Sequence, residues 1–190
     1  MILRDVQSIQ TLLPLSSFKW RYLMLDKVWF TYKARIQAYH RLEWMDSHSQ
    51  FILVWYAVLG AALSVIVIRF PTLLGSDTDI FSAILSIALL GVSLSVANRN
   101  FRGRAINMRG NYLALQNLYN VIYTRGQTAS EDIVKYNELL NEVDNHSDMD
   151  DKVFRVKNFR ALTTRKPDWK EFAHVYITCV IKYIILILVY

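Results

Sequence analysis

Two uninterrupted apolar runs, residues 51–68 and 80–97, dominate the pattern of hydrophobic and polar positions. Each contains 18 residues and no charged side chain. At about 1.5 Å per residue a helix of this length extends about 27 Å, close to the hydrocarbon thickness of a bilayer. Because lipid offers no hydrogen-bonding partners, a spanning chain must satisfy its own backbone and so must be helical. The pattern therefore predicts an all-α membrane protein built on a two-transmembrane helical hairpin.

Two other interpretations of the apolar runs are disfavoured. A cleavable signal peptide begins with a short basic segment, whereas about fifty mostly polar residues precede Phe51. A pair of buried core helices rarely combines spanning length with a complete lack of charge. We therefore assign 51–68 and 80–97 as the spans and 69–79 as the loop between them.

The basic residues near the spans predict which way the hairpin points. The loop has only Arg69 at its edge, together with Asp77 and Asp79. Both flanks of the hairpin are basic: Arg4, Lys19, Arg21, Lys27, Lys33, Arg35 and Arg41 precede it, and Arg99, Arg102, Arg104 and Arg109 follow it. By the positive-inside bias, the flanks 1–50 and 98–190 are expected in the cytoplasm and the loop outside.

The flanks are predicted to be helical. The chain has only six glycines and three prolines and lacks the alternation of strands. One long helix over about 18–45 should run into the first span, and a second over about 101–123 should follow the second span. Their proposed contact stripes are Leu23, Lys27, Phe30, Ala34, Ala38 and Leu42 on the first, and Ala105, Met108, Tyr112, Leu115, Leu118 and Ile122 on the second.

Shorter helices are predicted beyond residue 123. Residues 128–131 have the form of a capping box that opens a helix to about Val143. The acidic stretch 144–151 lacks the glycine and the final glutamate of a calcium loop, and is interpreted as a solvated loop. A basic helix is expected over 152–165 and an apolar helix over 175–190. With Lys182 near its middle, the apolar helix has three readings: a strained third span, an interfacial helix or an oligomer-facing core helix. We favour a cytoplasmic or interfacial packing helix.

No constellation of catalytic side chains is evident. The four histidines are scattered, Cys179 is the single cysteine, and no glycine-rich loop follows a strand. We therefore expect no catalytic residue, no cofactor, no metal site and no enzymatic activity. The net charge of +6 is explained by orientation and by attraction to anionic lipid, about 1 kcal/mol per basic residue. It does not predict sequence-specific nucleic-acid binding.

Small residues mark the second span, and they have two explanations. They let helices in lipid approach closely, and serines can bond across such contacts. Alternatively, a serine face lines an oligomeric pore that Leu89 closes by dewetting. Both explanations require a homo-oligomer. The residues assigned to pore lining or helix packing are Ser82, Ser86, Leu89, Gly91 and Ser93 in the second span, with Gly60 and Ser64 in the first.

Several segments around the hairpin resemble a known family. These are the stretch from Tyr32-Lys33-Ala34-Arg35 to Arg41-Leu42, then Phe101-Arg102-Gly103-Arg104-Ala105, and finally Arg109-Gly110-Asn111-Tyr112 with Ala114 to Tyr119. With the hairpin they resemble the SLATT domain, the two-transmembrane effector domain associated with SMODS nucleotidyltransferases and SLOG sensors. The layout is most similar to the subgroup found beside reverse transcriptases, including those of retrons.

The resemblance implies an effector of bacterial anti-phage defence in the inner membrane. Such proteins are thought to assemble and breach the membrane once a cytoplasmic partner senses infection. The expected partner is a reverse transcriptase with its non-coding RNA and DNA, or a nucleotide-signalling enzyme. Five arginines match the family pattern and are assigned to partner or lipid contact: Arg35, Arg41, Arg102, Arg104 and Arg109. The alternative role for them is pairing between helices, with Glu43 as a candidate partner. The alternative function is a non-conducting anchor or scaffold that recruits a cytoplasmic partner.

Overall fold

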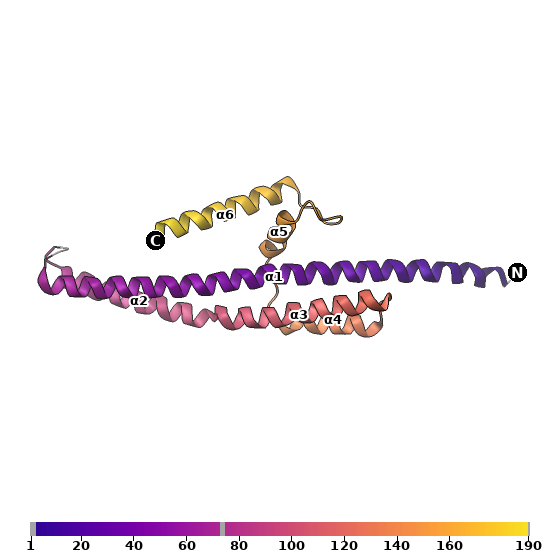
Figure 1. Cartoon of the computed structure of the whole chain (residues 1–190), viewed down its shortest axis with the longest axis horizontal. Helices are drawn as coiled ribbons and strands as arrows, with labels where there is room; N and C mark the ends of the chain where they lie inside the picture. The colour runs from indigo at the N-terminus through magenta and orange to yellow at the C-terminus, as the bar shows by residue number, and fades with distance from the viewer. Residues whose placement is uncertain (1–2, 73–74, 190) are drawn as a thin grey trace. The chain divides into compact units, whose positions relative to one another are not determined.

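All the regular structure in the described part of the chain is α-helical (Figure 1). The computed structural model describes the backbone of residues 3–72 and 75–189, and the side chains of 21–72 and 75–186. The helices are α1 (Leu3–Arg69), α2 (Thr78–Arg99), α3 (Phe101–Arg125), α4 (Ser130–Glu142), α5 (Asp148–Lys157) and α6 (Trp169–Val189). Two of them carry apolar stretches long enough to cross a membrane, which confirms the predicted all-α two-span class.

The chain divides into two compact units. One unit contains residues 1–39 and 106–190, and is called here the helical unit. The other contains residues 40–105, and is called the hairpin unit. Helix α1 passes from the first to the second without interruption, as predicted for a helix that feeds directly into the first span.

In the hairpin unit, the apolar stretches of α1 and α2 bury none of their residues within a single copy. Aromatic side chains mark the start of the first span, where the rings of Phe51 and Trp55 stack with 6.5 Å between their centroids. Amphipathic rings favour the headgroup level of a bilayer, so this pair suits the start of the first span. The apolar surface left open by one copy is available to lipid or to other copies.

Helix α3 does not simply continue α2, because Asn100 interrupts the helix. Asn100 has a left-handed backbone, with φ of 43° and ψ of 48°. Its side-chain oxygen accepts a hydrogen bond of 3.2 Å from the backbone N–H of Gly103, which satisfies a free donor at the start of α3. A Cβ at position 103 would lie 2.5 Å from Asn100 Nδ2, so the Asn100 side chain needs the glycine there.

In the helical unit, α1 packs against α3 and α4 around one hydrophobic core (Figure 1). The buried members are Met24, Val28 and Tyr32 of α1, Leu115, Leu118 and Ile122 of α3, and Tyr136 and Leu139 of α4. The expected pairing of the two long helices is therefore confirmed. Four of the six residues expected in the α1 stripe are buried, namely Phe30, Ala34, Ala38 and Leu42. Met24 and Val28 are buried in place of Leu23 and Lys27.

The turn between α3 and α4 is held by Asp132. Its carboxylate accepts hydrogen bonds of 2.7 Å from Arg125 Nη1 and 2.7 Å from the backbone N–H of Ala129. The helix begins after Ala129, one residue later than the predicted capping box at 128–131. The shift follows from this carboxylate, because Asp132, rather than Glu131, lies close enough to bond both the end of α3 and the start of α4.

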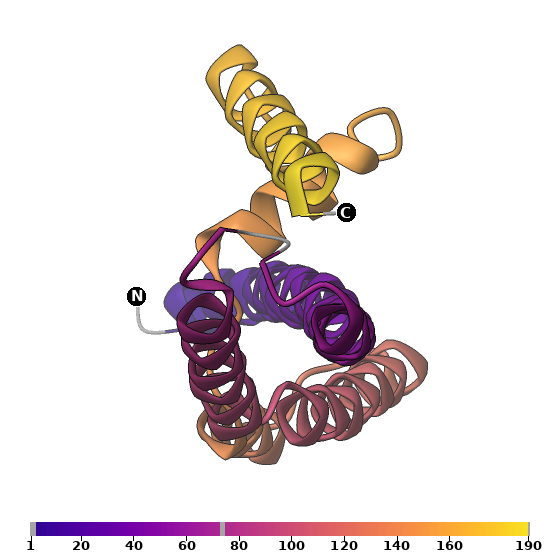
Figure 2. The same cartoon turned by 90° about the vertical axis from the view of Figure 1, so that its left-hand side faces the viewer.

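Helices α5 and α6, with the loop between them, form a C-terminal arm on the other side of α1 from α3 and α4 (Figure 2). Phe154 of α5 packs edge-on against Trp29 and Phe30 of α1, with ring centroids 5.4 and 6.1 Å apart. The basic helix expected over 152–165 is wrong in its bounds. Helix α5 starts earlier because Ser147 and Asp150 form a capping box, and it ends at Lys157.

Helix α6 begins at Trp169, six residues before the predicted start. Asp168 Oδ1 accepts from the backbone N–H of Glu171 (2.9 Å), and Glu171 Oε2 accepts from that of Asp168 (3.2 Å). This reciprocal cap explains why polar residues join the helix ahead of its apolar part. Glu171 also receives two hydrogen bonds from Arg155, of 2.7 and 2.5 Å, which tie α6 to α5.

Two glycines of α3 provide a matched test of the Asn100 cap. An added Cβ at Gly110 meets no atom within 4 Å, so Gly110→Ala should stabilise the helix by up to about 1 kcal/mol. Gly103→Ala gains the same propensity but displaces the capping side chain, which costs about 1 kcal/mol. We expect thermal unfolding in detergent to show a higher Tm for Gly110→Ala and little or no gain for Gly103→Ala. Equal gains would contradict the assigned role of Gly103.

Candidate functional site

The two spans enclose a groove of about 410 Å³ within the hairpin unit. Five of the seven residues predicted for pore lining or helix packing line it: Gly60, Ser64, Ser82, Ser86 and Leu89. Gly91 and Ser93 do not line it. The remaining lining residues are Ile52, Leu53, Tyr56, Leu59, Leu63, Leu85, Ala88 and Val92. None of the lining residues carries a formal charge.

The serine hydroxyls of the groove already have partners on their own helices. Ser64 donates to the carbonyl of Gly60, Ser82 to that of Thr78 and Ser86 to that of Ser82, each at 2.9 Å. Bonds to the carbonyl four residues earlier let a serine lie in lipid without water. Each hydroxyl oxygen can still accept a further hydrogen bond from water or from another helix.

The small residues of the spans are not explained by packing within one copy. A Cβ added at Gly60 or at Gly91 meets no atom within 4 Å. Glycine weakens a helix by up to about 1 kcal/mol relative to alanine. Within a single hairpin no close packing contact at these glycines offsets that cost. Close approach of another helix would provide the compensation.

A second polar site lies in the helical unit, where Arg35 is completely buried. Its Nη1 donates to the carbonyl of Leu139 at 2.9 Å, and its Nη2 to the carbonyl of Leu140 at 3.2 Å. These carbonyls belong to the last turn of α4, which has no intrahelical donors for them and carries the negative end of the helix dipole. Burial lowers the pKa of Arg35, while Tyr136 and Glu142 act in the opposite direction. The guanidinium therefore fastens the end of α4 to α1.

Asn111 of α3 completes this buried cluster. Its side-chain oxygen accepts a short hydrogen bond from Arg35, and its Nδ2 donates to the Leu139 carbonyl (2.8 Å) and to Glu142 Oε2 (2.9 Å). The two residues come from the separate segments that carried the family resemblance. Sequence reasoning placed Tyr112 in the contact stripe, where it is partly buried against the core, but missed Asn111. The signal for Asn111 was its place among Met108, Leu115, Leu118 and Ile122, at alternating intervals of three and four.

The five arginines assigned to partner or lipid contact have different environments. Arg35 lies inside the helical unit and bonds residues of α3 and α4, which fits the expected alternative of pairing between helices. Arg102, Arg104 and Arg109 are exposed on α3. Arg41 is half-buried, with its Nη1 4.0 Å from the sulfur of Met45. For these four, contact with lipid or with a partner remains a prediction.

His146 lies beside the Arg35 cluster, in the loop between α4 and α5. Its Nδ1 is buried and has no hydrogen-bond partner among the described residues. Burial, and then the charge of Arg35, lowers the pKa of His146 below its ordinary value of 6.5. The nearby carboxylates of Asp151, Asp150 and Asp148 oppose this shift. A charged imidazolium is therefore disfavoured here.

Within residues 3–72 and 75–189, no group of three or more His, Cys, Asp or Glu is placed to hold a metal ion. Cys179 is exposed on α6. The polar groups brought together are thus the groove serines and the Arg35 cluster. The first group can contact water or another helix, and the second stabilises the helical unit.

Replacement of Arg35 tests the second role. Arg35→Met removes the buried donor from the end of α4 and should lower the free energy of unfolding by about 3 kcal/mol. Arg109→Met is the matched control, because Arg109 is exposed, and it should change stability by less than about 0.5 kcal/mol. Thermal or urea unfolding in detergent measures both. A similar loss from the two variants would contradict the structural role of Arg35.

Acidification tests the environment of His146. Because its pKa is lower in the folded than in the unfolded protein, the unfolded protein binds more protons as the pH falls through 6.5. Stability should therefore decrease as the pH falls below 6.5, and His146→Gln should flatten this dependence. Amide hydrogen exchange over residues 139–150 measures this loss of local stability, once the rates are corrected for the pH dependence of intrinsic exchange. An unchanged pH dependence in His146→Gln would contradict this assignment.

Residues 22–190 match the family described as SMODS and SLOG-associating 2TM effector domain family 5, SLATT_5. No curated protein matches the chain, and no solved structure does. The family match covers the two spans, the groove and the Arg35 cluster, and agrees with the predicted SLATT resemblance. The chain is a membrane protein that belongs to the SLATT_5 family of two-transmembrane effector domains.

Proposed function

We propose that this chain is the membrane effector of a bacterial anti-phage defence system. It oligomerises in the inner membrane and permeabilises it when a cytoplasmic partner releases or activates it, which causes abortive infection. Both flanks of the hairpin are cytoplasmic in this proposal. The effector breaches a barrier and catalyses no reaction.

The observation that carries this proposal is a surface of small residues on the spans that has no packing contacts within one copy. Gly60 and Gly91 have open space around them, and neither apolar stretch is buried within one copy. Neighbouring copies would use this surface, since small residues let helices in lipid approach closely. One hairpin cannot enclose a channel, so permeabilisation requires such an assembly.

The groove serines support a conducting form. Ser64, Ser82 and Ser86 line one groove, and their oxygens retain acceptor capacity for water. Leu89 lies among them and would close a narrow pore by dewetting. Without formal charge in this lining, the pore should discriminate poorly between cations and anions.

The continuity of α1 supports control by a partner. One helix carries both the buried Arg35 and the first span. A cytoplasmic protein that contacts the helical unit would therefore act on a segment directly joined to the membrane. The partner we propose is a reverse transcriptase with its nucleic acids, or a nucleotide-signalling enzyme.

One observation favours a second candidate, a non-conducting scaffold. The hydroxyls of Ser64, Ser82 and Ser86 are satisfied by their own helices and require no water-filled pore. In that case the spans anchor the chain and the helical unit recruits the partner. Leakage from proteoliposomes in the presence of the activating partner would exclude the scaffold.

Substitutions in the second span test the pore. Expression of the full chain without its partner should depolarise the cell, as measured with a potential-sensitive dye. Leucine at Ser82, Ser86 and Ser93 together should abolish this depolarisation, because bulky apolar groups exclude water, while cross-linking still detects oligomers. Ser95→Leu is the control, since Ser95 neither lines the groove nor belongs to the residues predicted to line the pore.

Two outcomes would contradict parts of this proposal. One is a normal membrane potential although the wild-type chain is in the membrane, which would contradict pore formation in the absence of the partner. The other is undiminished depolarisation by the triple variant, which would remove the pore-lining assignment of the serines.

A further inference from the structure

Helix α6 exposes a broad apolar surface that nothing in the described part of the chain covers. Val175 is buried, whereas Ile177, Val180, Ile181, Ile184 and Ile185 are exposed. On a helix these five form one continuous strip along the axis. Soluble proteins rarely expose a strip of this kind without a partner.

An aromatic line borders this strip. Trp169, Tyr176 and Tyr183 are spaced seven residues apart, which places them in one row along the helix. Their exposed fractions are 74%, 67% and 66%. Tyrosine and tryptophan favour the boundary between lipid headgroups and acyl chains. The row extends about 21 Å along the axis, so all three rings can lie at that boundary only when the helix is parallel to the membrane.

A polar line borders the other side of the strip. His174, Thr178 and Lys182 follow one another at intervals of four. Thr178 donates to the carbonyl of His174 at 2.9 Å. In a spanning helix Lys182 would lie in hydrocarbon, whereas in a parallel helix the whole line reaches the headgroups.

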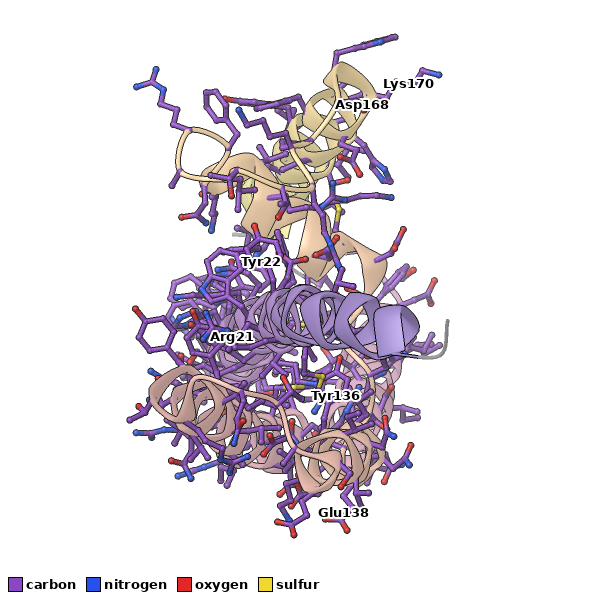
Figure 3. The ribbon with its side chains drawn as sticks, turned by 90° about the vertical axis from the view of Figure 1, so that its right-hand side faces the viewer. Arg21, Tyr22, Tyr136, Glu138, Asp168 and Lys170 are labelled. Atoms are coloured by element: carbon purple, nitrogen blue, oxygen red, sulfur yellow. The ribbon has the colours of Figure 1, made fainter. Side chains whose placement is uncertain are left out.

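The arm is also basic. Lys157, Arg160, Lys166 and Lys170 are exposed and form no ion pair with the described residues. Figure 3 shows Asp168 and Lys170 at the outer end of the arm, where α6 begins. Beyond Glu171 no acidic residue remains in the chain. Exposed cations beside an apolar helix are attracted to anionic headgroups.

We propose that α6 lies in the interface of an anionic bilayer, with Ile177, Ile181 and Ile184 in the acyl chains and Trp169, Tyr176 and Tyr183 at the headgroups. The Arg155–Glu171 pair holds the start of α6 against α5, so α6 attaches the arm to the membrane surface. This is a third membrane contact of the chain, and it requires neither a pore nor an activator. Of the three interpretations of residues 175–190, which were a third span, an interfacial helix and an oligomer-facing core helix, this proposal selects the interfacial helix.

The single native cysteine allows a matched pair of probes in the full-length protein. Cys179 and Ile181 are two residues apart, so their side chains point to nearly opposite sides of α6. One protein carries an environment-sensitive NBD label on Cys179. The other carries it on Ile181→Cys in a Cys179→Ser background, with Ile184→Cys as a second apolar position. Each is reconstituted in phosphatidylcholine vesicles with and without phosphatidylglycerol.

With phosphatidylglycerol, the labels at 181 and 184 should be quenched by lipids that carry a doxyl group high on the acyl chain. Iodide in the buffer should quench the Cys179 label several-fold more strongly than these two. Without phosphatidylglycerol, the lipid quenching at 181 and 184 should fall. Replacement of Lys157, Arg160, Lys166 and Lys170 by Gln should reduce this lipid dependence, whereas Lys135→Gln on α4 should leave it unchanged.

Four results would overturn the proposal. Iodide access at 181 and 184 equal to that at 179 would mean that α6 stays in water. Strong quenching at all three positions by a doxyl group near the end of the acyl chain would mean that α6 spans the bilayer. Protection of 181 and 184 from both iodide and doxyl lipids would mean that a second copy covers the strip. Equal quenching in the two lipid mixtures would mean that the basic residues do not attract the arm to anionic headgroups.

Discussion

The hydrocarbon interior of a bilayer contains no water to hydrogen-bond a protein backbone, and this constraint governs the rest of the structure. It requires the two apolar runs to be helices, because a helix satisfies every peptide group within the segment. It also explains why Ser64, Ser82 and Ser86 donate to carbonyls of their own helices. Because the spans obtain no hydrophobic stabilisation from lipid contact alone, small residues that permit close helix packing become important.

The helical unit faces a different constraint. It is surrounded by water, but helix ends buried inside it still leave backbone groups without intrahelical partners. The end of α4 packs against α1 and α3, so its last carbonyls need donors from elsewhere. Arg35 and Asn111 supply them. We expect a polar cluster of this kind to favour one register, because its hydrogen bonds form only when these segments are aligned in this way. Two segments that are far apart in the sequence thereby become dependent on each other.

The two units of the chain have different roles. The hairpin unit presents surface that one copy does not use, around Gly60 and Gly91, and this is where assembly is proposed. The helical unit is tied internally by charge-assisted hydrogen bonds, at Arg35 in its core and between Arg155 and Glu171 in the arm. The proposed control by a partner depends on α1, the helix that both units share.

The sequence by itself determined the class of the protein, the two spans and the long helices beside them. These follow from local patterns of apolar and polar residues, which read directly as helical periodicity and spanning length. Only the tertiary structure decided that Arg35 is internal, that Asn111 is buried, and that Met24 and Val28 replace Leu23 and Lys27 in the contact face of α1. It also decided the left-handed break at Asn100 and the early start of α6. The physical reason is that burial, register and capping depend on which segments meet, and no single segment encodes its neighbours.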